Sequence, residues 1–371
     1  MTGFRIHTQI NLCKTFNEFI DEFSIKETDL ILTDKFLYDK FILPKQLPCN
    51  IIIQDEFGGG EPTDTKVKKI LGIAGNLNYD RVIAIGGGTC IDISKIVVLS
   101  DVKDLLGLFQ GKISPKRERK LIIVPTTCGT GSEITNISIV AFEELGTKIG
   151  LAKDEIFADT AVLIPEFLYD LPYKVFAFSS VDALIHAIES YLSPNSSEIS
   201  RFFSEEAIRL ILNGYKDIKL NGKSSIKDYM EKYLLASTYA GIAFSNAGCG
   251  LIHAMSYPLS GEYHLPHGEA NHQMLMAVMR YYDKENPDGD IKNLYSIFAD
   301  ILDCSADEVL VKFKDLVNSM IERKPLSSFG ADEEYIKKFS RQVVETQRRL
   351  LKNAYIPTDE TKMYEIYKTL L

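Results

Sequence analysis

The sequence predicts an α/β domain with a parallel sheet, followed by an all-α domain. The first half of the chain alternates short β-rich runs with helical stretches, which is the pattern of a parallel sheet covered by helices. From about residue 165 onward the strand signals disappear, and consecutive helical patterns take their place. A chain of 371 residues is also too long for one compact core. We therefore expect two domains, residues 1–164 and 165–371.

Hydrophobic patterns and chain breakers place the individual elements. In the first domain we expect buried strands at 30–32, 51–53, 81–85 and 121–124, helices at 63–77 and 90–99, and a β-hairpin formed by 136–142 and 147–152. In the second domain, apolar residues recur at helical spacing between clusters of proline, glycine and asparagine. We expect helices at 173–192, 198–220, 226–245, 271–283, 291–301, 306–321, 333–352 and 360–370.

Composition and charge exclude several classes of protein. The chain carries 42 basic and 51 acidic residues, and its net charge of −9 disfavours non-specific nucleic-acid binding. The N-terminal segment lacks a signal-peptide pattern, and we expect no apolar run of membrane-spanning length. The six cysteines form no C-x-x-C pair, so neither a disulfide framework nor a zinc–thiolate site is indicated. We expect a cytoplasmic protein that binds neither nucleic acid nor membrane.

Histidines cluster in one part of a histidine-poor chain. Three of the six lie within residues 248–268, and His186 follows Asp182 by one helical turn. That spacing puts a carboxylate oxygen and an imidazole nitrogen on one helix face. With His253 and His267 they would form a metal site of one hard oxygen and three borderline nitrogens, which suits Fe(II), Zn(II) or a neighbouring divalent metal. The alternative for any one of these histidines is a hydrogen-bonded core residue.

Two polar loops follow predicted strands. Residues 86–89 (GGGT) lie between a strand and a helix, where backbone N–H groups can approach a phosphate. Residues 125–133 (PTTCGTGSE) crowd hydroxyls and glycines at the end of the next strand, where open α/β sheets bind ligands. The G-x-G-x-x-G pattern is absent, and the first loop alone can be a tight turn. Together the loops predict a Rossmann-like dinucleotide site.

Asp34 ends the first β-rich run of the predicted sheet. An acidic residue in this place can accept hydrogen bonds from an adenosine ribose and repel a 2′-phosphate, so we predict NAD as the cofactor. The alternative is an ordinary turn residue or helix cap.

With these pieces in place, the chain resembles the iron-dependent (group III) alcohol dehydrogenase family along essentially its whole length. The matching motifs are GGGTCID, PTTCGTGSE, VDALIHAIESY, and GLIHAMSYPL followed by LPHGEAN. The resemblance implies a dehydroquinate synthase-like architecture, a metal on the four ligands named above, and hydride transfer to NAD. It implies cofactor contacts at Gly87, Gly88, Thr89, Asp92, Thr126, Thr127, Thr130, Ser132 and Lys148.

One position departs from the family pattern, in which a second histidine follows the third metal ligand by one helical turn. Here Tyr257 takes that place. Either Tyr257 or His264 can begin a proton relay from the substrate hydroxyl, and the alternative for Tyr257 is a packed aromatic side chain.

The segments SYPL, GEYHLPHGEAN, RKPLSSFG and QRRLLKNAY are most similar to family members that interconvert 4-hydroxybutyrate and succinate semialdehyde. A substrate carboxylate in a closed site needs a cationic partner, for which Arg349 and His264 are candidates; each can equally be structural. We expect a small hydroxy acid or aldehyde as substrate, and a homodimer or larger homo-oligomer. The alternatives are another alcohol or diol dehydrogenase of the family, a lyase resembling dehydroquinate synthase, and a non-catalytic protein that senses NAD or metal.

Overall fold

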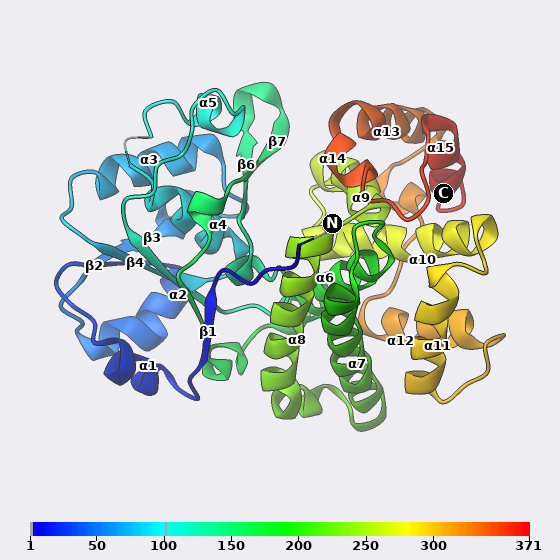
Figure 1. Cartoon of the computed structure of the whole chain (residues 1–371), viewed down its shortest axis with the longest axis horizontal. Coiled ribbons are helices and arrows are strands. Elements are labelled where there is room, and N and C mark those ends of the chain that lie inside the picture. The colour runs from blue at the N-terminus through cyan, green and yellow to red at the C-terminus, as the bar shows by residue number, and fades with distance from the viewer. Residues whose placement is uncertain (1–2, 101) are drawn as a thin grey trace. The chain divides into compact units, whose positions relative to one another are not determined.

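The computed structural model describes residues 3–100 and 102–371, which form two compact units (Figure 1). The sheet unit comprises Ile6–Thr127 and Gly131–Leu171. The helical unit comprises Pro172–Leu371, together with Cys128–Thr130 and residues 3–5. We expected one domain boundary, after residue 164. In the structure the sheet unit ends at Leu171, and Cys128–Thr130 of the PTTCGTGSE loop belong to the helical unit.

The sheet unit is built on six parallel strands in the order β1-β8-β5-β4-β2-β3. They are β1 (Gln9–Leu12), β2 (Asp29–Thr33), β3 (Asn50–Ile53), β4 (Arg81–Gly86), β5 (Lys120–Pro125) and β8 (Thr160–Leu163). The predicted parallel sheet is confirmed, and the prediction lacked only β1 and β8 at one side of it. A separate antiparallel hairpin joins β6 (Ile137–Phe142) to β7 (Thr147–Ala152), as predicted.

Strand register brings the functional loops to one edge of the sheet. Thr33 of β2 is level with Ile85 of β4, and Gly86 of β4 is level with Pro125 of β5. The chain moves outward from β2 to β3, then crosses back to β4 and continues to β5. The boundary between β2 and β4 is therefore the switch point at which ligands bind in sheets of this kind.

Alternate residues of the strands face the covering helices, as the two-residue repeat requires. One face of β2, β4 and β5 forms a buried core with α3 (Asp64–Ala74), α4 (Gly88–Val97) and α5 (Leu105–Phe109). The sheet unit also contains α1 (Phe16–Phe23) and the single turn α2 (Lys35–Leu37). Phe16 of α1 packs against Phe167, with the ring centroids 5.4 Å apart.

The helical unit consists of ten helices among its described residues. They are α6 (Tyr173–Leu192), α7 (Glu198–Asn221), α8 (Ile226–Ala247), α9 (Leu251–Tyr263), α10 (His267–Glu285), α11 (Asp290–Leu302), α12 (Val309–Met320), α13 (Glu333–Thr346), α14 (Arg348–Leu351) and α15 (Glu360–Lys368). The predicted helix 333–352 was wrong as one element, because the chain leaves the helix at Gln347. The prediction also lacked α9.

Helix α6 is the central element of this unit and packs against α7, α8 and α10. By length and composition alone, its 20 residues, with a mean hydropathy of 1.2 over the most apolar 18-residue window, are sufficient to cross a membrane, which corrects our expectation that no apolar run is long enough. However, 83% of its most apolar window is buried by protein. Its apolar composition is therefore accounted for by packing against three neighbouring helices.

Candidate metal and cofactor sites

The helical unit brings together the four residues that the sequence indicated as metal ligands. Asp182 and His186 lie one turn apart on α6, with His186 Nδ1 3.9 Å from Asp182 Oδ2. His253, in the first turn of α9, and His267, the first residue of α10, each place Nε2 3.6 Å from Asp182 Oδ1. The rings of His186 and His253 stack with centroids 4.6 Å apart. Side chains from three helices thus converge on one carboxylate.

This cluster has a closed side and an open side. Asp182, His186 and His253 are buried, whereas the side chain of His267 is 31% exposed. The ring of Tyr257 lies beside His267, with centroids 5.8 Å apart. Within this unit, a small molecule can therefore approach from the side of His267 and Tyr257.

Glu189 orients His253 from one turn beyond His186 on α6. His253 Nδ1 donates to Glu189 Oε2 over 2.6 Å, and the backbone N–H of Ile252 donates to Glu189 Oε1 over 2.5 Å. The Nδ1 proton is thereby fixed, and Nε2 is left facing Asp182. Among the described residues this buried Nε2 has no hydrogen-bond partner. An unpaired buried nitrogen opposite a carboxylate is a place for a cation, so the residues fit a metal.

The charges of the cluster favour a cation as well. Burial alone would raise the pKa of Asp182, but the imidazoles of His186, His267 and His253 hold this pKa well below its ordinary value. Burial also lowers the pKa of His253, yet Asp182 and Glu189 outweigh it and raise this pKa to about 9. Both carboxylates therefore favour a positive charge beside His253.

His186 is held in the form that a metal ligand needs. Burial lowers its pKa to about 3, so the imidazole is neutral at physiological pH. Its Nδ1 lies 3.4 Å from the carbonyl oxygen of Gly129. If Nδ1 carries the proton and donates to this carbonyl, the lone pair of the neutral ring is on Nε2.

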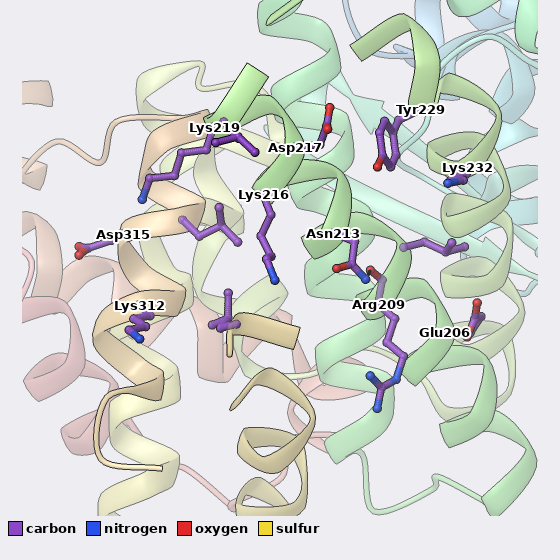
Figure 2. A pocket seen from close by; sticks show the side chains of 14 residues that line it. Glu206, Arg209, Asn213, Lys216, Asp217, Lys219, Tyr229, Lys232, Lys312 and Asp315 are labelled. Carbon is purple, nitrogen blue, oxygen red and sulfur yellow. Dashed lines mark hydrogen bonds between the residues drawn. The ribbon is translucent and has the colours of Figure 1, made fainter. Parts of the chain in front are cut away.

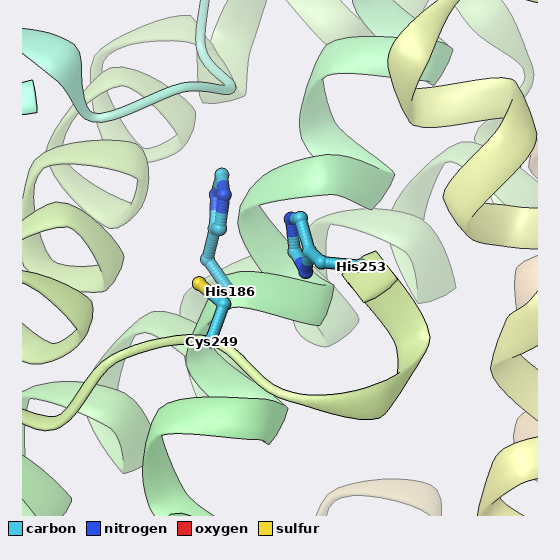
Figure 3. A group of neighbouring side chains, drawn as sticks. All are labelled: His186, Cys249 and His253. Carbon is cyan, nitrogen blue, oxygen red and sulfur yellow. The ribbon is translucent and has the colours of Figure 1, made fainter. Parts of the chain in front are cut away.

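The sequence reasoning missed three residues of the cluster. Glu189 is one, and Asn271 is the second, because its Nδ2 donates to Asp182 Oδ1 over 2.7 Å. The third is Cys249, whose sulfur lies within 4.8 Å of ligand nitrogens of His186 and His253 (Figure 3). Each depends on partners distant in the sequence, so no local pattern marks them.

The remaining candidates for substrate chemistry lie around this cluster. His264 is exposed and ends α9 with a left-handed backbone, three residues before His267. Arg349 is exposed on α14. Burial raises the pKa of Cys249 well above its ordinary value, and the charge of Arg349 acts in the opposite direction. The guanidinium of Arg349 is therefore near enough to the cluster to influence it.

At the sheet edge, Asp34 lies at the switch point between β2 and β4. Its carboxylate accepts hydrogen bonds from Gln54 and from the backbone of Gly87. Only glycine fits at position 86, because a Cβ there would lie 2.5 Å from Cys90 Cβ and 3.0 Å from Asp34 Oδ2. No side chain caps α4 at Gly87, so the N–H groups of its first turn can bind phosphate. Gln54 was not predicted.

The first turn of α4 begins at Gly88, another of the predicted cofactor residues. Three more predicted cofactor residues, Thr89, Thr126 and Thr127, lie around this turn. Thr126 donates its backbone N–H to the carbonyl of Gly86 over 3.1 Å. Thr127 packs on Gly87, where an added Cβ would lie 3.3 Å from its methyl group. Thr89 donates its hydroxyl to the carbonyl of Gly60 over 3.2 Å.

The other predicted cofactor residues have structural partners. Asp92 accepts from the Ser132 hydroxyl and from the backbone N–H of Ile139, both over 3.0 Å, and so ties α4 to β6. Buried Lys95 donates to Ser132 over 2.8 Å. Lys148 on β7 forms an ion pair with Glu61. Thr130 follows Gly129 within the part of the loop that belongs to the helical unit.

A hollow on the helical unit, with a volume of about 1110 Å³, is lined by none of these residues (Figure 2). Side chains of α7, α8 and α12 form most of it. Arg209 pairs with Asp300 over 2.7 Å, and Lys216 pairs with Asp303 over 2.8 Å. We interpret it as a solvated surface groove.

Comparison with known proteins gives the family. Residues 5–165 match the iron-containing alcohol dehydrogenases, and residues 176–371 match the C-terminal part of the Fe-containing alcohol dehydrogenase family. The chain belongs to the iron-containing alcohol dehydrogenase family. Its α/β and helical units confirm the predicted dehydroquinate synthase-like architecture of this family.

Individual relatives match over most of their length. This alcohol dehydrogenase is 44% identical over 356 residues to the 4-hydroxybutyrate dehydrogenase of Clostridium kluyveri, covering 96% of each chain. It is 33% identical over 318 residues to long-chain-alcohol dehydrogenase 1 of Geobacillus thermodenitrificans, covering 83% of this chain and 79% of the relative. The crystal structure of sulfoacetaldehyde reductase from Bifidobacterium kashiwanohense in complex with NAD+ has the same fold, with a TM-score of 0.86 at 23% identity, covering 100% of this chain and 98% of the other.

Proposed function

We propose that this iron-containing alcohol dehydrogenase interconverts 4-hydroxybutyrate and succinate semialdehyde with NAD as the hydride acceptor or donor. The observation that carries the proposal is the 44% identity to a 4-hydroxybutyrate dehydrogenase over 96% of both chains. The site supports the reaction class, because three imidazoles converge on one buried carboxylate, and Nε2 of His253 has no hydrogen-bond partner among the described residues.

Asp182, His186, His253 and His267 would hold a divalent metal, with Fe(II) favoured over Zn(II). A bound divalent cation supplies Lewis-acid chemistry by polarising the C–O bond of the alcohol or aldehyde. Glu189 keeps the His253 ring in the orientation that directs Nε2 at the site. The open side at His267 and Tyr257 admits the substrate.

The hydroxyl proton leaves through Tyr257 in this proposal. Tyr257 lies beside the most exposed ligand, His267, and a phenol there can pass a proton between the substrate and water. His264 is the alternative, since it is exposed to solvent three residues before His267.

Arg349 is the proposed partner for the carboxylate of the substrate. Of the two candidate cations, Arg349 is the one whose charge lowers the pKa of Cys249 in the cluster. A guanidinium can bind a carboxylate through two parallel hydrogen bonds, which would orient a hydroxy acid with its hydroxyl toward the metal ligands.

NAD would bind at the switch point of the sheet unit. Asp34 supplies an acceptor for the adenosine ribose, and the uncapped turn that begins at Gly88 supplies N–H groups for the pyrophosphate. Asp92, Ser132 and Lys148 support the loops that line this edge.

The test compares NADH formation from 4-hydroxybutyrate, 1,4-butanediol and 1-butanol under identical conditions. If the carboxylate positions the substrate, kcat/KM for the alcohols should be on the order of 10- to 100-fold lower. An alcohol or diol as good as the hydroxy acid would contradict the substrate but leave the dehydrogenase class intact. A cytoplasmic location stays a prediction, supported by the six cysteines that form no disulfide. A homo-oligomeric state also stays a prediction.

A further inference from the structure

We propose that Cys249 enables the metal centre to hold a thiophilic divalent cation, such as Zn(II), through His186, Cys249 and His253. The inference rests on the metal centre of the proposed function and gives this centre a second ligand set that contains sulfur. It also revises our expectation from cysteine spacing, which indicated no zinc–thiolate site.

The three side chains form a compact buried group (Figure 3). Each offers one ligand atom, and these atoms lie within 4.8 Å of one another. A tetrahedral zinc ion with Zn–S of about 2.3 Å and Zn–N of about 2.0 to 2.1 Å places its ligand atoms about 3.3 to 3.6 Å apart. Side-chain adjustments of about 1 Å would therefore complete the site.

The loop that carries Cys249 is fixed in place. Gly248 has φ +83°, and a Cβ there would lie 2.2 Å from Asn353 Nδ2. A Cβ at Gly250 would lie 3.1 Å from the carbonyl oxygen of Asn353. Asn195 holds Asn353 through a hydrogen bond of 2.8 Å between their side chains. The glycines before and after Cys249 thus both pack closely against Asn353, which keeps the thiol beside the imidazoles.

His253 is the ligand that the two sets share. Its Nδ1 is engaged by Glu189, and its Nε2 is buried without a hydrogen-bond partner among the described residues. Toward Asp182 and His267, this nitrogen belongs to a harder set of oxygen and nitrogen ligands. With His186 and Cys249, the His253 side chain also belongs to a softer set that contains sulfur. Thiolate favours zinc and other soft cations, so the identity of the cation decides which set is used.

Binding of the cation exchanges a thiol proton for the metal and changes no oxidation state. The S–H bond of Cys249 breaks, a sulfur–metal bond forms, and the proton is released to solvent. The divalent cation offsets the negative charge of the thiolate in the buried site. A buried cysteine that only fills space would show no such exchange of a proton for a metal.

The experiment loads metal-free protein with one equivalent of Zn(II) or Co(II). X-ray absorption of the zinc form should show a sulfur neighbour at about 2.3 Å. The cobalt form should show a thiolate-to-cobalt charge-transfer band, which is lost in Cys249→Ser and retained in the control Cys304→Ser. Cys304 is half-buried in the segment after α11 and lies outside both ligand groups.

The outcomes separate this inference from the proposed function. Zinc bound with only oxygen and nitrogen neighbours, or a charge-transfer band that survives in Cys249→Ser, would overturn the inference and leave the metal centre intact. Absence of stoichiometric metal in the unmutated protein would overturn both. The zinc absorption measurement decides the question even if Cys249→Ser does not fold.

Discussion

The Nδ1 atom of His253 lies 2.6 Å from a carboxylate oxygen of Glu189, and this carboxylate stands on the same helix as Asp182 and His186. One helix therefore supplies two proposed metal ligands and also the group that orients a third. Because outer carboxylates fix ring orientation and raise ligand basicity, the effect of Glu189 should be measurable as metal affinity.

We expect Glu189→Gln to weaken metal binding by about 10- to 100-fold, as measured by competition with a chelator. The neutral amide keeps the size of the side chain but removes the charge that favours Nδ1–H donation. Glu205→Gln is the control, because Glu205 forms only a partly exposed pair with Arg209. Equal affinities of Glu189→Gln and the unmutated protein would show that Glu189 only packs.

Replacing His253 by alanine should remove both bound metal and turnover, since the His253 side chain belongs to both candidate ligand groups. His272→Gln is a matched control, because His272 is another buried histidine but donates to the carbonyl of Ile321 over 2.8 Å. Metal content is read by elemental analysis. Stoichiometric metal and normal turnover in His253→Ala would refute the ligand assignment.

Asp34→Gly should narrow the preference for NAD over NADP. In the unmutated protein the 2′-phosphate of NADP would approach the Asp34 carboxylate, which is hydrogen-bonded to Gln54. The two negative charges would repel each other, and the carboxylate offers the phosphate no cationic partner. The ratio of kcat/KM for the two cofactors measures this effect. Asp39→Asn, on the exposed side of the next helical turn, should leave the ratio unchanged. Equal efficiency of the unmutated enzyme with both cofactors would rule out the role of Asp34.

Two neighbouring arginines allow a matched test of substrate binding. Arg349→Met should lower kcat/KM for 4-hydroxybutyrate by about 10- to 100-fold and leave 1-butanol nearly unchanged, because only the hydroxy acid offers a carboxylate. Arg348→Met removes an equally exposed charge from the same turn and should affect neither substrate. Parallel losses for both substrates in Arg349→Met would indicate a structural role.

His272 should make the metal-free protein sensitive to acid. Burial lowers its pKa to about 4, whereas an unfolded histidine titrates near 6.5. The unfolded state therefore binds more protons between these values, so stability is full above pH 6.5 and falls as the pH drops toward 4. The loss amounts to at most about 3 kcal/mol. Urea unfolding at pH 7.5 and 4.5 should show a smaller pH effect in His272→Gln, and the same slope in both proteins would contradict this.

Sequence patterns predicted the sheet and most of the helices because these elements satisfy local rules. Strands β2, β4 and β5 each begin with a charged residue and continue as an uninterrupted apolar run, which is typical of buried parallel strands. Helix α9 was missed because it follows glycines and contains Pro258, which are signals of chain breaks. One helical turn before Pro258, the carbonyl of Met255 accepts a hydrogen bond from the Tyr367 hydroxyl. Tyr367 is distant in the sequence, so no local pattern contains this contact.

The candidate site shows the same division. Asp182 and His186 were found from spacing within one helix, since a helical repeat determines which side chains share a face. Glu189 lies on that helix too, but an acidic residue in an apolar helix is uninformative until its partner is known. That partner, His253, is 64 positions away in the chain.

If the proposed metal is bound, the convergence of α6, α9 and α10 on Asp182 makes the stability of the helical unit depend on metal supply. A cation held by all three helices acts as a crosslink that only the folded chain can form. Each tenfold rise in free metal above the dissociation constant then adds about 1.4 kcal/mol to the stability of the helical unit. In a cell starved of this metal, the same protein would open more often and meet proteases sooner.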